Sequence, residues 1–315
     1  MRFFRKTNID FIGKRYIWYT ISATIILAGM ISLAVRGLDY GIDFLGGTEI
    51  VIHFTNQVEI GNVRTALNTV MLGESEIKNF GSRNDILIRT RKQGPGSSVS
   101  NEIQGALRKQ FSQNELTVIK EDKIGPKIGG ELRLDALKSI FISLVVILIY
   151  LGFRFQFVYG AGAVAGLFHD VLLTLGLVSI VNGMSSYLNL EMTQTMVAAF
   201  LTLICFSNND TVVIFDRIRE NRKLYRTEGL ISIFNRSINE TLSRTIITSG
   251  TIFLVLLMIF FFGGEINRGF AFTLLIGVVT GTYSSIYVAS ALVVEWTLYK
   301  ERRKNAQSKA IAPAS

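Results

Sequence analysis

Six apolar segments, each long enough to cross a lipid bilayer as a helix, dominate this chain of 315 residues. About 20 apolar residues in helical form span the hydrocarbon core, where the backbone must satisfy its own hydrogen bonds. Hydrophobic residues make up 49% of the chain and charged residues only 18%, which is typical of a polytopic membrane protein. The predicted spans are Tyr16–Val35, Leu134–Phe153, Val158–Val181, Met192–Ile214, Thr245–Gly263 and Gly269–Val294.

The first span has no small-residue cleavage site, so it is predicted to be a retained anchor rather than a signal peptide. Lysine and arginine gather in the N-terminal tail, in residues 217–243 and in the C-terminal tail 300–315, whereas the two short loops on the other side hold only Arg268. Basic loops face the cytoplasm, so both termini are predicted to be cytoplasmic. The net charge of +9 is therefore an orientation signal, and nucleic acid is not expected as a partner.

Residues 36–133 form the one sizeable segment outside the spans. Alternation and helical spacing predict the order strand, helix, strand, strand, helix, strand, which is a ferredoxin-like α+β domain on the extracytoplasmic side. The elements are Thr48–Phe54, Ile60–Leu72, Glu76–Phe80, Asp85–Thr90, Val99–Phe111 and Leu116–Lys120. No catalytic constellation is found here, so we expect a docking or force-transmitting module and not an enzyme. The chain thus divides into residues 1–35, the domain 36–133, the bundle 134–299 and the basic tail 300–315.

Glycine-rich junctions flank this domain. Gly46 and Gly47 lie after the first span, and Gly125, Gly129 and Gly130 precede the second. Glycine permits positive φ and sharp changes of backbone direction. We therefore expect hinges or tight turns at the membrane surface. A phosphate-binding loop is excluded because no lysine follows Gly46 and Gly47 and a strand comes next.

Asp210 and Arg244 are the charges that a bilayer should disfavour, and they mark the strongest candidate site. Asp210 lies within the fourth apolar segment and Arg244 opens the fifth. Antiparallel neighbouring helices would bring both to similar depth, where an ion pair or a shared hydrogen-bond network would form, with Asn209 supporting the carboxylate. Intramembrane charges of this kind mark ion and proton pathways. The alternatives are a static bridge that fixes helix packing, or an Arg244 that extends to the headgroups.

A second polar pair, His169–Asp170, lies near the middle of the third span. It is a candidate relay site, although a satisfied packing network is the more frequent role of such a pair. No set of histidines at ligand spacing accompanies it, so neither a metal site nor a metal phosphohydrolase is expected. Intramembrane aspartyl proteolysis by Asp170 and Asp210 is disfavoured, since neither lies in the glycine–aspartate motif that this chemistry uses. The single cysteine, Cys205, is expected to be a buried, inert thiol.

Two further expectations concern packing. Apolar residues on one face of 217–243 predict a helix lying on the membrane surface; they are Leu230, Ile233, Phe234, Ile238 and Leu242. Gly162-x-x-x-Gly166 and Gly277-x-x-x-Gly281 predict closely packed helices, within the chain or with a partner.

Several motifs together resemble the SecD/SecF family of bacterial protein-export membrane proteins, and specifically its SecF branch. The resemblance covers nearly the whole chain, in order and spacing. The matching segments are 41–48 with its Asp-Phe-Leu-Gly-Gly-Thr run, 150–155, His169–Asp170, 209–211 with 215–221, 244–250 and 284–290. One departure is Cys205-Phe206, where the family has a glycine–tyrosine pair.

The resemblance implies one six-helix half of a resistance-nodulation-division type fold in the bacterial inner membrane, with SecD as the other half. It implies use of the proton motive force, with protons as the coupling ion and no cofactor, in late steps of secretory-chain translocation through the SecYEG channel. Asp210 and Arg244 fall on the family's proton-relay positions. The implied partners are SecD, SecYEG, the emerging polypeptide and membrane lipids. Two alternatives stay open: half of a proton-driven exporter of small molecules or lipids, and a passive assembly factor of the translocon.

Overall fold

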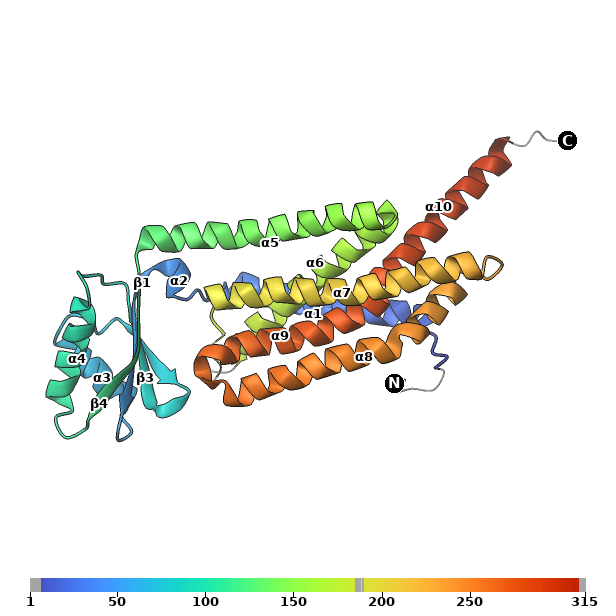
Figure 1. Cartoon of the computed structure of the whole chain (residues 1–315). Helices are drawn as coiled ribbons and strands as arrows, with labels where there is room; N and C mark the ends of the chain where they lie inside the picture. The colour runs from blue at the N-terminus through green and yellow to red at the C-terminus, as the bar shows by residue number, and fades with distance from the viewer. Residues whose placement is uncertain (1–6, 185–187, 189, 312–315) are drawn as a thin grey trace.

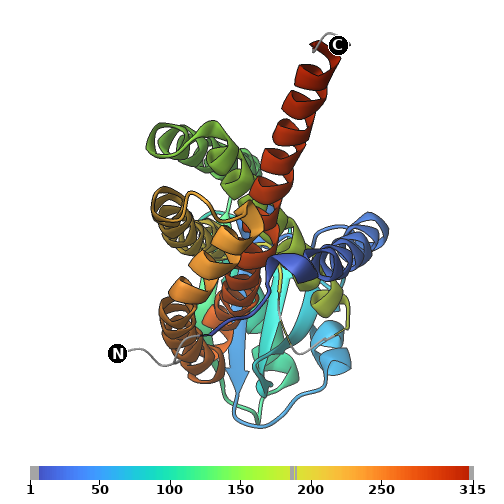
Figure 2. The same ribbon diagram turned by 90° about the vertical axis from the view of Figure 1, so that its right-hand side faces the viewer.

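The computed structural model describes residues 7–184, 188 and 190–311, and it consists of a long helical bundle with a small sheet domain at one end (Figure 1). Most of the long helices run roughly parallel to one another, whereas the helix of residues 157–184 crosses them obliquely, and the sheet domain lies beyond the ends of the bundle. The view along the bundle shows the helices surrounding the central rod of α9 and α10 (Figure 2).

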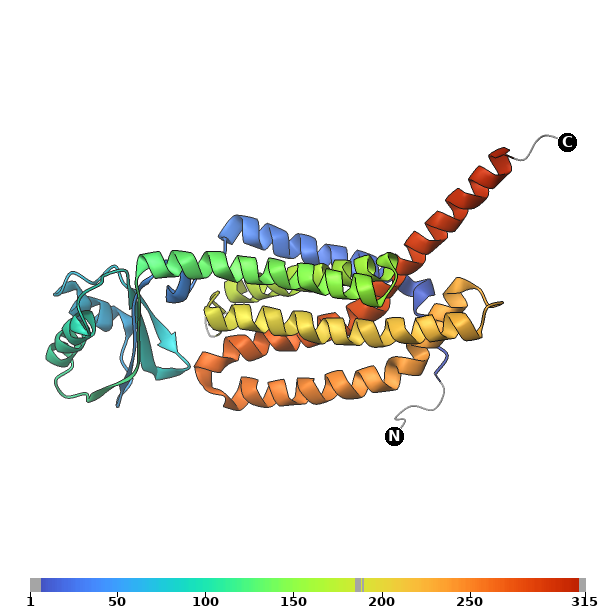
Figure 3. The same ribbon diagram turned by 45° about the horizontal axis from the view of Figure 1, so that its top comes forward.

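Within the described residues, six helices are long and apolar enough to cross a membrane, as the sequence predicts. Their bounds are α1 Arg15–Arg36, α5 Pro126–Arg154, α6 Phe157–Met184, α7 Gln194–Leu224, α8 Leu230–Phe262 and the rod formed by α9 Gly264–Ser284, the π-helical turn Ser285–Ala289 and α10 Ser290–Ile311. A short 3₁₀ turn, Ile12–Lys14, precedes α1. The predicted tail 300–315 is helical as far as Ile311, and α10 projects beyond the bundle (Figure 3).

The sheet domain has the predicted ferredoxin-like topology. Its elements are β1 Gly47–Phe54, α3 Ile60–Asn68, β2 Glu76–Phe80, β3 Ser82–Thr90, α4 Ser98–Gln110 and β4 Leu116–Ile124. The strands are ordered β2-β3-β1-β4 and all pairs are antiparallel. Alternate residues of β1 (Ile50, Ile52 and Phe54) pack with α3 and α4 in one buried core. The opposite face of the sheet carries charged residues, which become important at the junction with the bundle.

One glycine junction forms sharp turns and the other does not. Gly46, which follows the short helix α2 Ile42–Leu45, has φ of 72°, and Gly47, the first residue of β1, has φ of 136°. Gly129 and Gly130, predicted to lie at a turn, instead belong to the first turns of α5, because this helix begins at Pro126 with Gly125 as its N-cap residue. Proline at the first helical position is pre-organised for a helix start. The second span is therefore longer at its outer end than its apolar pattern indicates.

The predicted surface helix in 217–243 is wrong. α7 continues to Leu224, and α8 starts at Leu230 and runs without interruption into the fifth span. Ile233, Phe234 and Ile238 are buried in the bundle core. The N-terminal segment covers them, since the side chain of Asn235 accepts hydrogen bonds from the backbone N–H groups of Phe11 and Ile12. An apolar stripe can be buried by protein as well as by lipid, and here the N-terminal segment supplies the protein surface.

Close helix packing through glycine occurs within the chain. A Cβ added at Gly166 would lie 3.1 Å from the Cβ of Ala289, in the π-helical turn between α9 and α10. The tightest crossing, however, joins α1 and α6, where a Cβ added at Gly29 would lie 2.4 Å from the Cα of Gly176. Small residues allow backbones to approach this closely in membranes.

Candidate functional site

α7 places Asp210 on the face that packs against α8 and α9. Ser207, Asp210, Thr211 and Ile214 follow helical spacing along this face, and all four are buried. Only 7% of Asp210 is exposed. Because α7 extends to Leu224, Asp210 lies about halfway along the helix and not near its end.

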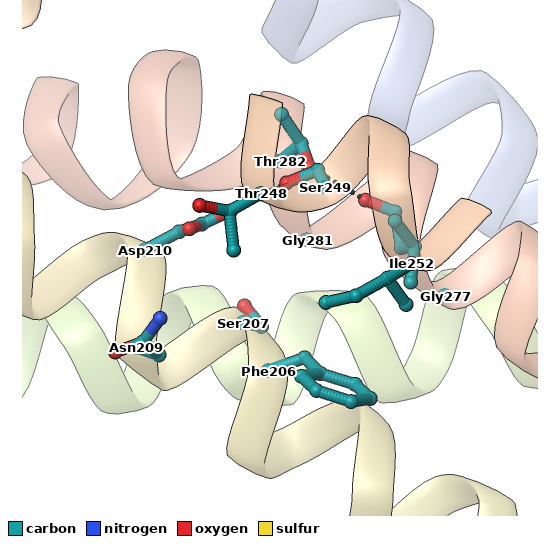
Figure 4. Close-up of a pocket in the computed structure, with 11 residues that line it drawn as sticks. Phe206, Ser207, Asn209, Asp210, Thr248, Ser249, Ile252, Gly277, Gly281 and Thr282 are labelled. Atoms are coloured by element: carbon teal, nitrogen blue, oxygen red, sulfur yellow. Dashed lines mark hydrogen bonds between the residues drawn. The ribbon is translucent and has the colours of Figure 1, made fainter. Parts of the chain in front are cut away.

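The carboxylate of Asp210 opens onto a small polar cavity between α7, α8 and α9 (Figure 4). Ser207, Thr248 and Ser249 supply polar atoms to the wall, and Phe206 and Ile252 close it at the apolar end. Its volume of about 20 Å³ is enough for roughly one water molecule. The hydroxyl of Ser249 donates a hydrogen bond of 3.0 Å to Oδ2 of Asp210. The site therefore offers one carboxylate, hydroxyl donors and room for water.

Arg244 lies on α8, the same helix as Ser249, and its side chain is exposed on the surface of the isolated chain. Both side chains lie in the part of the chain that the structure describes, and no nitrogen of Arg244 comes within 4 Å of a carboxylate oxygen of Asp210. In this conformation Asp210 is held by Ser249, with Arg244 nearby and free of a direct bridge.

Two neighbours of Asp210 differ from expectation. Asn209 lines the cavity, but within the described part of the chain its side chain makes no hydrogen bond to Asp210. Cys205, expected to be buried, is exposed, because it lies on another face of α7 from Asp210. Apolar surroundings in sequence predicted burial, but in a membrane an apolar face can meet lipid instead of protein.

His169 and Asp170 form a second polar cluster deep in the bundle. Nδ1 of His169 lies 3.0 Å from Oδ1 of Asp170, and Oδ2 of Asp170 accepts hydrogen bonds from Ser207 at 2.5 Å and Ser284 at 2.8 Å. Nε2 of His169 lies 3.1 Å from the hydroxyl of Tyr283. Asp170 is 1% exposed. Sequence spacing alone gave no sign of Ser207, Ser284 and Tyr283 as its partners, since they come from α7 and α9.

Within residues 7–184, 188 and 190–311, no group of three or more histidine, cysteine, aspartate or glutamate side chains is placed to hold a metal ion. The candidate site is thus a carboxylate with hydroxyl donors around it.

A third cluster, which the sequence did not reveal, joins the sheet domain to the start of α7. Glu191 precedes α7, and its carboxylate pairs with Arg89 of β3 at 2.5 Å and with Lys78 of β2. Burial by itself would raise the pKa of Glu191, but the hydrogen bond from Arg89 and the charges of Lys78 and Arg89 outweigh burial and lower it. The pKa of Arg89 is raised in turn, because its carboxylate partners Glu191 and Glu49 outweigh the effect of its burial. The sequence contained one sign of this cluster, because Glu191 is an isolated acidic residue directly before the fourth apolar segment.

Backbone contacts reinforce this junction. The linker after α1 pairs with the segment before α7, since Met192 N donates to Asp39 O at 2.7 Å and Gly41 N donates to Met192 O at 2.9 Å. The side chain of Asp43 then accepts from the backbone N–H of Gln194, at the first turn of α7. The helix that carries Asp210 is therefore tied at its outer end to both the linker and the sheet domain.

Comparison with known proteins agrees with this architecture. The sequence pattern of "Protein export membrane protein SecD/SecF, C-terminal" matches residues 103–299, and the SecD/SecF GG motif matches residues 31–58. The chain belongs to the SecF family. The SecF protein translocase subunit of Rhodothermus marinus is 44% identical over 94% of this chain and 95% of its own length, and that of Desulfurispirillum indicum is 42% identical over 91% of each.

Solved structures of SecDF share the fold. SecDF from Thermus thermophilus, described as a translocon-associated membrane protein, has a TM-score of 0.81 and 34% identity over 92% of this chain. SecDF in a super-membrane-facing form has a TM-score of 0.70 and 32% identity over 98% of this chain. This SecF-family chain spans about two-fifths of each SecDF chain, 39% and 41% respectively.

Proposed function

We propose that this chain is the SecF subunit of a bacterial protein translocase and that, together with SecD, it uses the proton motive force to assist late steps of secretory-chain translocation. The chain would sit in the inner membrane with both termini in the cytoplasm and the ferredoxin-like domain outside. SecYEG, the emerging polypeptide and membrane lipids would be its further contacts. The observation that carries the proposal is the carboxylate of Asp210, buried in the bundle yet facing a cavity with room for water.

Protonation of Asp210 would change how α7 and α8 pack. As a carboxylate, Asp210 accepts the hydrogen bond from Ser249, and a cation such as Arg244 on the same helix as Ser249 would favour this charged form. Once neutral, it loses its attraction to Arg244 and can itself donate. A proton that crosses ~100 mV releases about 2.3 kcal/mol, which is enough to bias a two-state element by more than tenfold.

The outer end of α7 would carry this change to the sheet domain. Glu191 and the backbone bridge at Met192 join α7 to β2, β3 and the linker after α1. A shift of α7 therefore moves the base of the domain, which is the part that would hold or release an emerging polypeptide.

The test replaces Asp210→Asn in the full chain, assembled with SecD. We expect proton-dependent translocation into membrane vesicles to be lost, because asparagine cannot bind and release a proton, while the complex still assembles. Asp216→Asn is the matched control, since Asp216 lies on the same helix but pairs with Arg154 at the surface, away from the cavity. Undiminished proton-dependent translocation in the Asp210→Asn variant would reject the relay and favour a passive assembly factor.

A further inference from the structure

A continuous series of hydrogen bonds crosses the bundle beside the cavity of Asp210. It begins at Ser22 on α1, whose hydroxyl lies 2.8 Å from the hydroxyl of Tyr283 on α9. The Tyr283 hydroxyl contacts Nε2 of His169, and Nδ1 of His169 contacts Oδ1 of Asp170. Four polar side chains from three helices are thus joined in the interior, at distances of 2.8 to 3.1 Å.

The second carboxylate oxygen of Asp170 is shared by two serine donors. Ser207 on α7 and Ser284 on α9 both donate to Oδ2, and both are buried, at 3% and 1% exposure. The titratable groups facing Asp170 are His169 from its own helix and, one hydrogen bond further, Tyr283; α1 and α7 contribute hydroxyls at these contacts. A buried carboxyl is costly unless it is paired or neutralised, and here an imidazole is its only titratable direct partner among the described contacts.

Ser207 belongs to both polar clusters. It donates to Asp170, and it also lines the cavity of Asp210, three residues further along α7. Side chains at i and i+3 are neighbours on a helix surface, so a water molecule in the cavity can reach both Ser207 and Asp210. Gly281 forms the wall behind Ser207, where a Cβ would lie 2.9 Å from the Cβ of Ser207. Ser284 does not line this cavity.

We propose that His169 and Asp170 form a second protonatable site, which exchanges a proton with Asp210 through Ser207 and one cavity water. When Asp170 is neutral, its Oδ2 carries the proton and the Ser207 hydroxyl turns from Asp170 to donate to the cavity water. Asp170 then gives its proton to the oxygen of Ser207, while the original Ser207 proton passes to the water and a water proton passes to the Asp210 carboxylate. One proton moves, and Ser207 and the water are regenerated. The protonated imidazole of His169 then returns a proton to Asp170 from Nδ1.

This inference rests on the proposed function, in which Asp210 binds and releases protons. It adds the route by which a proton reaches Asp210 from the interior of the bundle. A packing role for the same network makes a different prediction, because Ser207 and Ser284 would then be equivalent donors to one carboxylate oxygen.

The experiment compares Ser207→Ala with Ser284→Ala in the full chain, reconstituted with SecD in sealed vesicles. An internal pH-sensitive dye reports proton flux under an imposed pH difference. Because a positioned proton-transfer group contributes factors of ~10² or more, we expect Ser207→Ala to lower the flux by at least about tenfold. Ser284→Ala removes an equivalent hydrogen bond outside the route and is expected to lower it by no more than about threefold. Ser207→Thr keeps the hydroxyl and is expected to restore most of the flux.

Equal losses for Ser207→Ala and Ser284→Ala would overturn the route, as would no loss for either or a threonine variant no better than alanine. A flux that Asp210→Asn leaves unchanged would instead reject the proposed function. In that case the proton route is tested separately, by infrared titration of the Asp170 carboxyl group. Its absorption band is assigned by comparison with the Asp170→Asn variant, in which the band is missing. We expect Asp210→Asn to shift the midpoint of that band when Ser207 is present and not in Ser207→Ala. An unshifted midpoint with Ser207 present overturns the exchange.

Discussion

At the scale of single residues, the cost of a side chain depends on what the tertiary structure places opposite it. Gly29 and Gly250 both lie inside membrane-spanning helices, yet their surroundings differ. A Cβ at Gly29 would meet the backbone of Gly176, whereas nothing lies within 4 Å of a Cβ at Gly250. The sequence shows two intrahelical glycines and does not distinguish them.

Gly29→Ala is expected to destabilise the bundle by about 1–3 kcal/mol, because α1 and α6 must separate to admit the methyl group. Gly250→Ala, the matched control, is expected to be neutral or to stabilise by up to ~1 kcal/mol through helix propensity. Unfolding of the purified chain in mixed micelles, followed by circular dichroism, measures both. Equal stability of the two variants would show that the α1–α6 contact contributes little.

At the scale of elements, the junction between the sheet domain and α7 depends on Glu191. Its carboxylate is 7% exposed and pairs with two cations of the domain. Glu191→Gln leaves Arg89 and Lys78 with one fewer charged partner in a buried site, so we expect the free energy of opening this junction to fall by about 1–3 kcal/mol. Hydrogen exchange of residues 190–194 reports the opening, and Glu121→Gln on β4 is the control for loss of a carboxylate elsewhere on the domain.

The same junction is expected to respond to acid. Because the pKa of Glu191 is lowered in the folded protein, its contribution to stability is complete above the ordinary value of 4.5 and is lost as the pH falls through the lower folded value. Exchange in residues 190–194, corrected for its intrinsic pH dependence, should therefore accelerate in that window and not between pH 6 and 8. The Glu191→Gln variant should lack the acid response, and an acid response as large as that of the unmodified chain would contradict the role of Glu191.

At the scale of the whole molecule, the six candidate spans of the described residues are an even number, so the start of α1 and the end of α10 lie at one side of the bundle. The sheet domain lies at the other side (Figure 1). Because basic residues gather at the side opposite the domain, we expect that side to face the cytoplasm. In a Cys205→Ser background, we expect Ser112→Cys in the domain to react with a membrane-impermeant thiol reagent added outside intact cells or spheroplasts. Thr227→Cys, in the turn between α7 and α8, is expected to react only after lysis. The reverse pattern would invert the topology.

The sequence by itself determined the six spans and the ferredoxin-like domain, because segment length against bilayer thickness and the periods of 2 and 3.6 are local properties of the chain. It also singled out Asp210, Arg244, His169 and Asp170, since charge inside an apolar run is visible without coordinates. Only the tertiary structure decided which groups meet: Ser249 rather than Arg244 at the carboxylate of Asp210, Ser207 between two polar clusters, and Glu191 against Arg89. It also decided that Gly129 and Gly130 are helical, that 230–242 is covered by the N-terminal segment, and that Cys205 is exposed. Those outcomes depend on partners far away in the chain, and a local pattern records that a face is apolar or polar but not what covers it.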